Sequence, residues 1–501
     1  MVSSNTSKYI KNSFIWGFLS KILDSIVKFI SVPLLLTYFG KEHFGLIALA
    51  FSINAYLQIL DMGVNIGSVK YFSEWILLKK HIILSSVART SISFYFVVGL
   101  VNFLLLVGLS FFTSELFSLN QESAEVFKEL LFVLATIAII NWSTTVFMQL
   151  LIANENMVYI QQWNVIKSLL NLVVLVVTLF FNLSLLSYFI LYVSINTLIF
   201  IPYYIKVKNE KLIDSVFPGF DWLNFRPILK YSLALILMAV FQATATKMRP
   251  IVLGVFSDKG VELIADYRIM ETISIFIISI GGMFITIFLP KTSKLILVNN
   301  QIEIQKFAYS TTKYTSFICC LLCFPLLLNS ENLILLYVGV EYVNLSFWLN
   351  IWIITILFFL HNTPIASLVL STGKTKMLVY SSGVACVVSL VVNSMFVEEF
   401  GAGSAVFGYS IYILIQMSFY YLYFNSKVLG LNSLLVFKSF VIPSFIGFCS
   451  LFLLIFLDFE FENTYVTIFI KSLVWYFVFF ILILLFRVFT FSELKRSLLT
   501  K

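Results

Sequence analysis

Hydrophobic runs of about 20 residues recur along the whole chain, and they limit its fold more than any other feature. A helix of about 20 apolar residues crosses the roughly 30 Å hydrocarbon core of a bilayer. Hydrophobic residues make up 60% of the 501 residues and charged residues only 12%, whereas the surface of a soluble domain needs far more charge. The runs do not alternate between polar and apolar residues, as the strands of a membrane barrel do. An all-α integral membrane protein is therefore predicted.

Fourteen transmembrane spans are predicted, and the connections between them are short. The longest connection covers 207–228, contains Pro218-Gly219, and separates the sixth span from the seventh. The first span contains Asp24 and Lys28 and lacks a small-residue cleavage site, so it is expected to be retained, unlike a signal peptide. The predicted spans are 13–37, 44–68, 89–112, 128–152, 159–181, 184–206, 229–255, 261–289, 306–329, 344–370, 376–397, 402–424, 434–457 and 464–488.

The distribution of basic residues predicts that both ends of the chain are cytoplasmic. Connections rich in lysine and arginine, such as the one with Lys79 and Lys80, alternate with acidic connections, such as the one with Glu122 and Glu125. Membrane proteins keep their basic connections on the cytoplasmic side. The net charge of +8 is therefore attributed to membrane topology, and nucleic-acid binding is not expected.

Two hairpins of the chain resemble each other and predict an internal duplication. Pro33-Leu-Leu-Leu-Thr-Tyr-Phe-Gly in spans 1 and 2 aligns with Pro250-Ile-Val-Leu-Gly-Val-Phe-Ser in spans 7 and 8. An offset of six spans is even, so the two halves share an orientation, and transporters with such repeats carry substrate between their halves. The predicted organisation is an N-terminal six-helix lobe at 1–206, a cytoplasmic inter-lobe linker at 207–228, a C-terminal six-helix lobe at 229–424, and an accessory helix pair, spans 13 and 14, with a cytoplasmic tail at 425–501.

Polar and ionisable side chains inside the predicted spans are the candidate functional residues. A charge at mid-bilayer costs about 2.5–3.5 kcal/mol on insertion scales, so it is expected to face a cavity or a partner. In the first span Lys21, Asp24 and Lys28 follow one another at spacings of three and four and share a helical face. Candidate substrate-binding residues are Lys21, Lys28, Asn54, Lys167, Lys247, Arg249, Arg268 and Lys313, and candidate coupling-ion or ion-pair residues are Asp24, Asp61, Asp266 and Glu271.

Basic residues outnumber acidic ones in this set, which predicts a cationic or neutral cavity between the lobes. Such a cavity suits an anionic ligand, and a diphosphate is the natural candidate because lysine binds phosphate as a point charge and arginine binds it as a fork. The acidic members would titrate or bind a coupling cation. An alternative stays open, in which ion pairs fasten helices together: Asp24 with Lys28, and Lys247 or Arg249 with an acidic residue of the eighth span.

No catalytic residue, cofactor or metal site is predicted. The five cysteines all lie in apolar runs and are interpreted as packing residues. His361 lies just before Pro364 in the tenth span, where a hydrogen-bonded packing role is favoured over a proton relay. Short connections without an acidic cluster argue against a membrane-bound polymerase or glycosyltransferase.

Five short motifs have an order and spacing that resemble those of a known family. Tyr38-Phe-Gly-Lys-Glu-His-Phe-Gly enters the second span and Leu60-Asp-Met-Gly lies near its end. Leu370-Ser-Thr-Gly-Lys-Thr-Lys follows the tenth span, Tyr337-Val-Gly-Val-Glu-Tyr precedes it, and Glu399-Phe-Gly-Ala-Gly precedes the twelfth. Together they resemble Wzx-type O-antigen and polysaccharide repeat-unit flippases of the multidrug/oligosaccharidyl-lipid/polysaccharide exporter superfamily. The resemblance covers nearly the whole chain.

The resemblance implies a two-lobed transporter of fourteen helices in the bacterial inner membrane. It would flip undecaprenyl-diphosphate-linked oligosaccharide repeat units from the cytoplasmic to the periplasmic leaflet, for the synthesis of O-antigen, lipopolysaccharide or capsule. Membrane lipids are expected partners, and a polysaccharide polymerase and a chain-length regulator are candidate partners. The alternative is a cation-coupled antiporter of the same superfamily that exports drugs or lipids. Asp24 would suit an antiporter, but the surplus of intramembrane bases argues against one.

Overall fold

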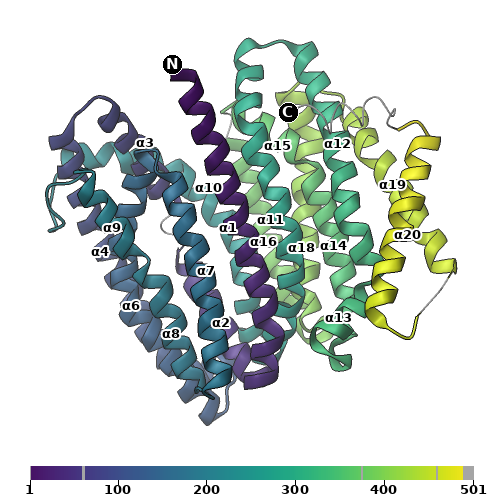
Figure 1. Ribbon diagram of the computed structural model, residues 1–501, viewed down its shortest axis with the longest axis horizontal. Coiled ribbons are helices and arrows are strands. Elements are labelled where there is room, and N and C mark those ends of the chain that lie inside the picture. The colour runs from purple at the N-terminus through teal and green to yellow at the C-terminus, as the bar shows by residue number, and fades with distance from the viewer. Residues whose placement is uncertain (1, 59–61, 374–375, 458–460, 489–501) are drawn as a thin grey trace. The chain divides into compact units, whose positions relative to one another are not determined.

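The computed structural model describes residues 2–58, 62–373, 376–457 and 461–488. Helices are the only regular elements of these residues (Figure 1), which confirms the all-α prediction. By length and composition, ten of the described helices can cross a membrane, or eleven if Leu345–His361 and Thr363–Ser371 form one bent span.

Each predicted span coincides with one helix or with two consecutive helices. The second, sixth, tenth and twelfth spans each consist of two elements, and the two parts of the tenth meet at an angle of 42°. Pro364 lies in the first turn of the second part, where its missing N–H costs no hydrogen bond. The elements are α1 (Val2–Phe39), α2 (Lys41–Leu57), α3 (Met62–Leu77), α4 (His81–Ser110), α5 (Thr113–Phe117), α6 (Gln121–Ala153), α7 (Met157–Phe180), α8 (Leu185–Leu198), α9 (Phe200–Asn209), α10 (Trp222–Val255), α11 (Gly260–Val298), α12 (Gln301–Leu328), α13 (Ser330–Val338), η2 (Val340–Tyr342), α14 (Leu345–His361), α15 (Thr363–Ser371), α16 (Lys376–Met395), α17 (Val397–Phe400), α18 (Gly403–Phe419), the π-helical segment η3 (Tyr420–Val428), α19 (Ser433–Leu457) and α20 (Thr464–Leu485).

The chain divides into two compact units, and the first comprises 1–268 with 396–402. Its central helix is α6, which packs against α2, α3, α4, α7, α8 and α9. Asn120 caps α6 because its side-chain oxygen accepts a hydrogen bond from the Ser123 amide at 2.8 Å. Within the core, the buried Gln149 of α6 donates to the Tyr95 hydroxyl of α4 at 2.8 Å. α6 therefore holds in place the helices that carry the candidate site.

The end of the predicted inter-lobe linker is fastened to α4 in the first unit. Arg89 donates from Nε to the Phe217 carbonyl oxygen at 2.9 Å, and the Thr90 hydroxyl accepts from the Asp221 amide at 2.7 Å. The Asp221 carboxylate caps α10 and accepts hydrogen bonds from Asn224 and Ser86. These donors hold the pKa of Asp221 below its usual value, because they favour the charged form.

A glycine in α2 allows two backbones of the first unit to approach closely. A Cβ atom on Gly45 would lie 2.2 Å from the carbonyl oxygen of Val261. The neighbouring atom belongs to a helix backbone and cannot rotate away. Gly45→Ala is therefore expected to destabilise the protein by about 1–3 kcal/mol, as overpacking does, and to lower the midpoint of thermal unfolding in detergent.

The control for this prediction is a second helical glycine, Gly108 in α4. A Cβ atom there meets no other atom within 4 Å. Gly108→Ala is expected to leave the midpoint unchanged or to raise it slightly, since alanine is favoured over glycine in a helix by about 0.5–1 kcal/mol. Equal midpoints for the two variants would show that the approach at Gly45 has no energetic consequence.

The second unit comprises 269–395 with 403–501, and α12 is its central helix. α12 packs against α14, α15, α19 and α20. Phe324 of α12 stacks on Trp475 of α20 with ring centroids 5.5 Å apart. On α19, Gly447 lies so close to the Phe324 ring that a Cβ atom would come within 2.4 Å of it. At the start of α12, Gln301 donates to the Leu429 carbonyl oxygen at 2.7 Å, which fastens the chain before α19.

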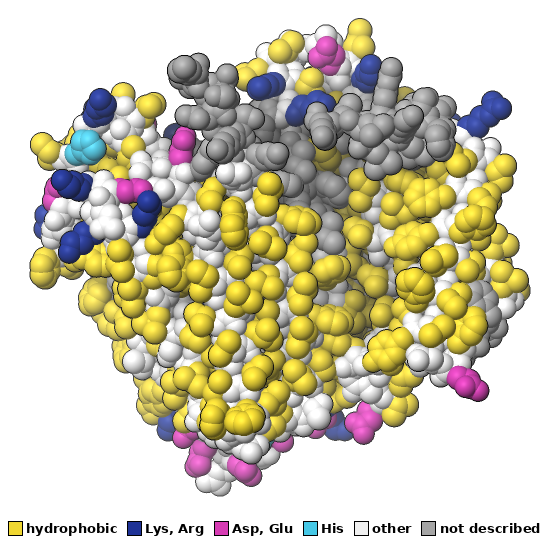
Figure 2. Space-filling model, viewed as in Figure 1, with side chains coloured by type: hydrophobic (Ala, Val, Ile, Leu, Met, Phe, Trp, Pro, Cys, Tyr) yellow, Lys and Arg dark blue, Asp and Glu magenta, His cyan; other side chains and the backbone are white. Residues whose placement is uncertain are grey.

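The visible face of the first unit is mostly hydrophobic, with charged side chains gathered at the ends of its helices (Figure 2). Large apolar side chains of this unit are exposed, such as Leu104 on α4 and Val176 on α7. Exposed apolar surface of this extent needs a lipid partner rather than water. The helices of the first unit therefore present a lipid-facing surface.

Candidate functional site

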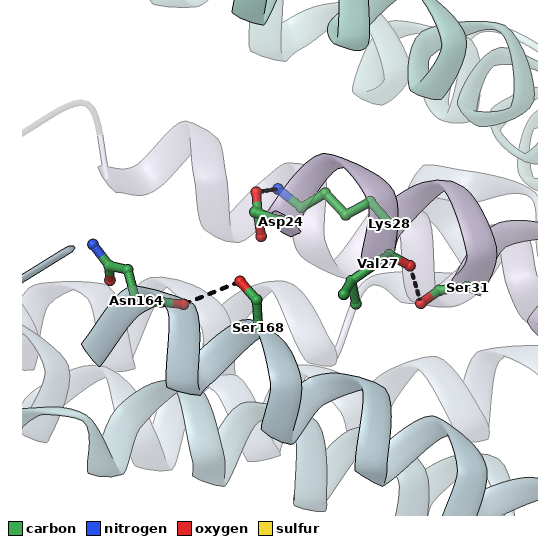
Figure 3. A network of polar contacts seen from close by, with 6 residues as sticks. All are labelled: Asp24, Val27, Lys28, Ser31, Asn164 and Ser168. Atoms are coloured by element: carbon green, nitrogen blue, oxygen red, sulfur yellow. Dashed lines mark hydrogen bonds and ion pairs between the residues drawn. The ribbon is translucent and has the colours of Figure 1, made fainter. Parts of the chain in front are cut away.

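The polar face of α1 carries an ion pair near the middle of the apolar stretch Ile15–Phe39. Lys28 Nζ lies 2.8 Å from Asp24 Oδ2, one helical turn away (Figure 3). The ion pair that the spacing suggested is therefore present. The Lys28 side chain is nevertheless 53% exposed and the Asp24 side chain 42% exposed. Charged groups at this depth avoid lipid, so their exposed sides are expected to meet water or a ligand.

α7 packs beside α1 and adds a second positive charge to this region. Asn164 and Ser168 of α7 point toward α1 in Figure 3, and the Ser168 hydroxyl donates to the Asn164 carbonyl oxygen at 3.1 Å. Lys167, between them in sequence, interacts electrostatically with both Asp24 and Lys28. The sequence placed no acidic residue beside Lys167, whereas the fold brings Asp24 of α1 within its range.

α11 contributes a third base to the same region. Arg268 donates from Nη2 to the Ser52 hydroxyl at 3.3 Å and to the Ala48 carbonyl oxygen at 3.4 Å, both on α2. It also interacts electrostatically with Lys28 and with Tyr192 of α8. α1, α2, α7, α8 and α11 therefore meet around one group of charges.

We call Lys28, Lys167, Arg268 and Asp24 the basic cluster. The cluster contains three bases and one acid, so it carries an excess of positive charge. Amide side chains extend the polar surface along α7 and α8, where Asn196 donates to Asn171 Oδ1 at 3.2 Å. The arrangement can hold an anion with several oxygen atoms, and amide groups nearby can bond to hydroxyl groups.

Asp266, a predicted coupling-ion or ion-pair residue, forms an ion pair with Lys41. The lysine Nζ lies 2.9 Å and 3.0 Å from the two carboxylate oxygens. Lys41 is the first residue of α2 and lies in the connection between the first two predicted spans. No local pattern could reveal this partner, because the two residues are 225 positions apart.

The other predicted residues lie at several places in the two units. Arg249 is buried in the first unit, donates to the Ala245 carbonyl oxygen at 3.1 Å, and lies over the Tyr267 ring. The first unit also contains Lys21, Asn54 and Lys247; Glu271 and Lys313 belong to the second unit; and Asp61 lies outside the described residues. The substrate and coupling roles of all these residues stay predictions.

His361 is a packing residue in the second unit. Its Nε2 atom lies 2.8 Å from the Tyr421 hydroxyl, and its ring stacks on Phe440 with centroids 3.9 Å apart. The cysteines at 319, 320 and 323 are buried. Within the described residues, no group of three or more His, Cys, Asp or Glu side chains could hold a metal ion.

The family model described as polysaccharide biosynthesis protein matches residues 10–296, more than half of the chain. The chain belongs to this family. The match runs from α1 into α11 and so includes every residue of the basic cluster. No curated protein sequence matches this chain.

Solved structures show the fold of this polysaccharide biosynthesis protein. The chain is similar to the lipid II flippase MurJ in an inward closed conformation, with a TM-score of 0.73, 16% identity, and coverage of 97% of this chain and 100% of that one. It is also similar to an inward-facing multidrug resistance MATE family transporter of the MOP superfamily, with a TM-score of 0.66, 14% identity, and coverage of 87% of this chain and 98% of that one. For a MOP superfamily transporter from Pyrococcus furiosus, the TM-score is 0.59 and the identity 13%, with coverage of 89% of this chain and 95% of that one.

These relatives are transporters and not enzymes. The chain is therefore a multi-pass membrane protein with the fold of MOP superfamily transporters. The resemblance to that superfamily predicted from the sequence motifs is confirmed.

Proposed function

We propose that the protein flips undecaprenyl-diphosphate-linked oligosaccharide repeat units from the cytoplasmic to the periplasmic leaflet of a bacterial inner membrane. The observation that carries the proposal is the basic cluster, a partly exposed excess of positive charge within mostly apolar helices. Membership of the polysaccharide biosynthesis family supports a glycan as cargo. The fold similarity to a lipid II flippase supports a lipid-linked one.

The diphosphate would bind at the basic cluster. Lys28 and Lys167 supply ammonium groups that hold phosphate oxygens as point charges, and Arg268 supplies a planar fork. Asp24 keeps Lys28 in place while the cluster is empty, through their 2.8 Å contact. An arriving diphosphate would compete with Asp24 for Lys28. Asn171 and Asn196 would bond to sugar hydroxyl groups.

Transport would follow by alternating access, in which the bound diphosphate is exposed first to one leaflet and then to the other. The proposed orientation, with both termini cytoplasmic, follows from the basic connections. The proposed cargo places the protein before the polymerisation of O-antigen or of a related surface polysaccharide.

A cation-coupled exporter of a drug or a lipid is the second candidate function. It is favoured by the similarity to a multidrug resistance transporter and by the intramembrane carboxylate Asp24. Such a role would require Asp24 to bind a cation or a proton during transport. The contact with Lys28 and the neighbouring charge of Lys167 oppose a further cation at this carboxylate, so the first proposal is preferred.

Deletion of the gene in its host tests the proposal. The expected result is loss of one surface polysaccharide and accumulation of its lipid-linked repeat unit in the cytoplasmic leaflet. The measurement combines gel analysis of surface glycans with extraction and mass spectrometry of lipid-linked sugars. A copy of the wild-type gene on a plasmid should restore both readouts. Unchanged surface glycans together with increased drug susceptibility would instead favour the exporter.

A further inference from the structure

A small pocket opens between α12 and α19 in the second unit. Its volume is about 220 Å³, and it is lined by Tyr309 and Lys313 of α12 and by Leu435, Lys438, Ser439 and Ile442 of α19. Two lysines, one from each helix, thus line one pocket. Two residues with hydroxyl groups and two with branched apolar side chains complete the lining. The basic cluster belongs to the other unit, so this is a separate site.

The chain that leads into α19 holds one side of the pocket in place. The Tyr309 hydroxyl accepts a hydrogen bond from the Asn432 amide at 3.0 Å, which leaves its own proton free to be donated. Asn432 also caps α19, since its side-chain oxygen accepts from the Leu434 amide at 2.9 Å. Further along the helices, α12 and α19 are closely packed at Phe324 and Gly447. The pocket therefore lies in the part of the α12–α19 contact that is nearest the start of α19.

Both lysines lie near the ends of their predicted spans that are expected to be cytoplasmic. α19 begins at Ser433, and Lys438 follows it by five residues, which is about 7.5 Å along a helix. Lys313 follows the start of the ninth predicted span, at 306, by seven residues, or about 10.5 Å. Lysine side chains near helix ends extend toward the headgroup layer, so we expect both ammonium groups at the depth of the lipid phosphates of the cytoplasmic leaflet.

We propose that this pocket binds the phosphate group of an anionic lipid. Lys313 and Lys438 would hold phosphate oxygens through charge-assisted hydrogen bonds. Tyr309 and Ser439 would donate from their hydroxyl groups, and Ile442 would contact the first part of the acyl chain. Basic pockets between transmembrane helices on the cytoplasmic side recognise phosphate headgroups in this way.

The size of the pocket limits what can occupy it. A volume of about 220 Å³ lies below the roughly 300–1,000 Å³ of sites for drug-sized ligands. It has room for a headgroup but not for an oligosaccharide. An anionic phospholipid and a polyprenyl diphosphate both present the required phosphate, so the experiment compares them directly. A bound lipid would join α19 to α12 and stabilise the contact between them.

Native mass spectrometry of the purified, delipidated full chain tests this site. The protein is titrated with phosphatidylglycerol, with undecaprenyl diphosphate, and with zwitterionic phosphatidylcholine. Lys313→Gln/Lys438→Gln is expected to weaken binding of the anionic lipid at least about tenfold, because two charge-assisted contacts are lost. The same two lysines replaced by arginine should retain binding. Lys306→Gln is the matched control, since Lys306 lies on α12, is exposed, and does not line the pocket.

The outcomes identify which of the two lipids binds, and they test this proposal independently of the flippase proposal. A tenfold loss seen only with phosphatidylglycerol identifies a phospholipid, and a loss seen only with undecaprenyl diphosphate identifies the carrier lipid. Unchanged affinity for both in the double variant, or equal affinity of the wild-type protein for phosphatidylcholine, would overturn the proposal. If the double variant does not fold, Ser439→Trp fills the pocket while keeping both charges and should also abolish binding. Lys28→Gln, in the other unit, should leave it unchanged.

Discussion

Lys28→Gln and Lys167→Gln are each expected to lower the delivery of surface polysaccharide at least about tenfold, and the triple variant that adds Arg268→Gln is expected to abolish it. Each base supplies a contact to the diphosphate, and a hydrogen bond to a charged group contributes about 1.5–3 kcal/mol. A loss of about 1.4 kcal/mol is a tenfold change in affinity. The measurement is complementation of the deletion strain at matched protein levels.

The control for the cluster is a lysine that forms a similar ion pair elsewhere in the first unit. Lys206 lies 2.9 Å from Glu210, one turn further along the chain, and its side chain is 34% exposed. Lys206→Gln should complement fully, because partly exposed pairs of this kind contribute little. Lys28→Arg should retain most activity, because the charge stays. Full complementation by the triple variant would show that these bases fasten helices and do not contact the cargo.

Breaking the ion pair between Lys41 and Asp266 is expected to lower the stability of the fold more than breaking the pair between Asp24 and Lys28. Lys41→Met leaves a carboxylate that is only 13% exposed without its cation. Breaking a fully buried pair costs about 3–5 kcal/mol, and the partial exposure of Lys41 reduces this to about 1–3 kcal/mol. The variant should therefore unfold at a lower temperature in detergent. Asp266→Asn should restore part of the loss when it is combined with Lys41→Met.

A double-mutant cycle measures the strength of this pair. The coupling free energy between Lys41 and Asp266 is expected to exceed about 1 kcal/mol, within the range of contacting residues. The more exposed pair of Asp24 and Lys28 serves as a comparison and should give at most about 0.5 kcal/mol, as helix pairs four residues apart do. Additive effects of Lys41→Met and Asp266→Asn would mean that the contact does not stabilise the fold.

The positions of the spans could be predicted because each depends on a local property. A run of apolar residues must become a helix in lipid, whatever its neighbours are. The breaks within spans were harder to predict. Pro364 in the first turn of α15 and Pro202 in the first turn of α9 each lie just after a break, but a proline is equally compatible with a continuous helix that is only kinked. The π-helical turns at the end of the twelfth span have no signal in the sequence.

In the candidate site, too, contacts within one helix could be predicted from the sequence, whereas contacts between helices could not. The shared face of Asp24 and Lys28 follows from a spacing of four residues and is present in the structure. The partners that come from other helices depend on packing, which a single sequence does not reveal. Arg268 reaches Ser52 because the start of α11 meets α2, and Lys167 lies within range of Asp24 because α7 packs against α1.

The most direct test of the central claim is transport by the purified protein in liposomes. Lipid-diphosphate-linked oligosaccharide with a fluorescent label is placed in one leaflet, and a membrane-impermeant quencher then reports how much label has crossed. Wild-type protein is expected to move the label well above the rate of protein-free liposomes. The triple variant of Lys28, Lys167 and Arg268 is expected to show no movement above that background. Equal rates for the wild-type protein and the triple variant, or no movement with the wild-type protein, would contradict the proposed flippase function.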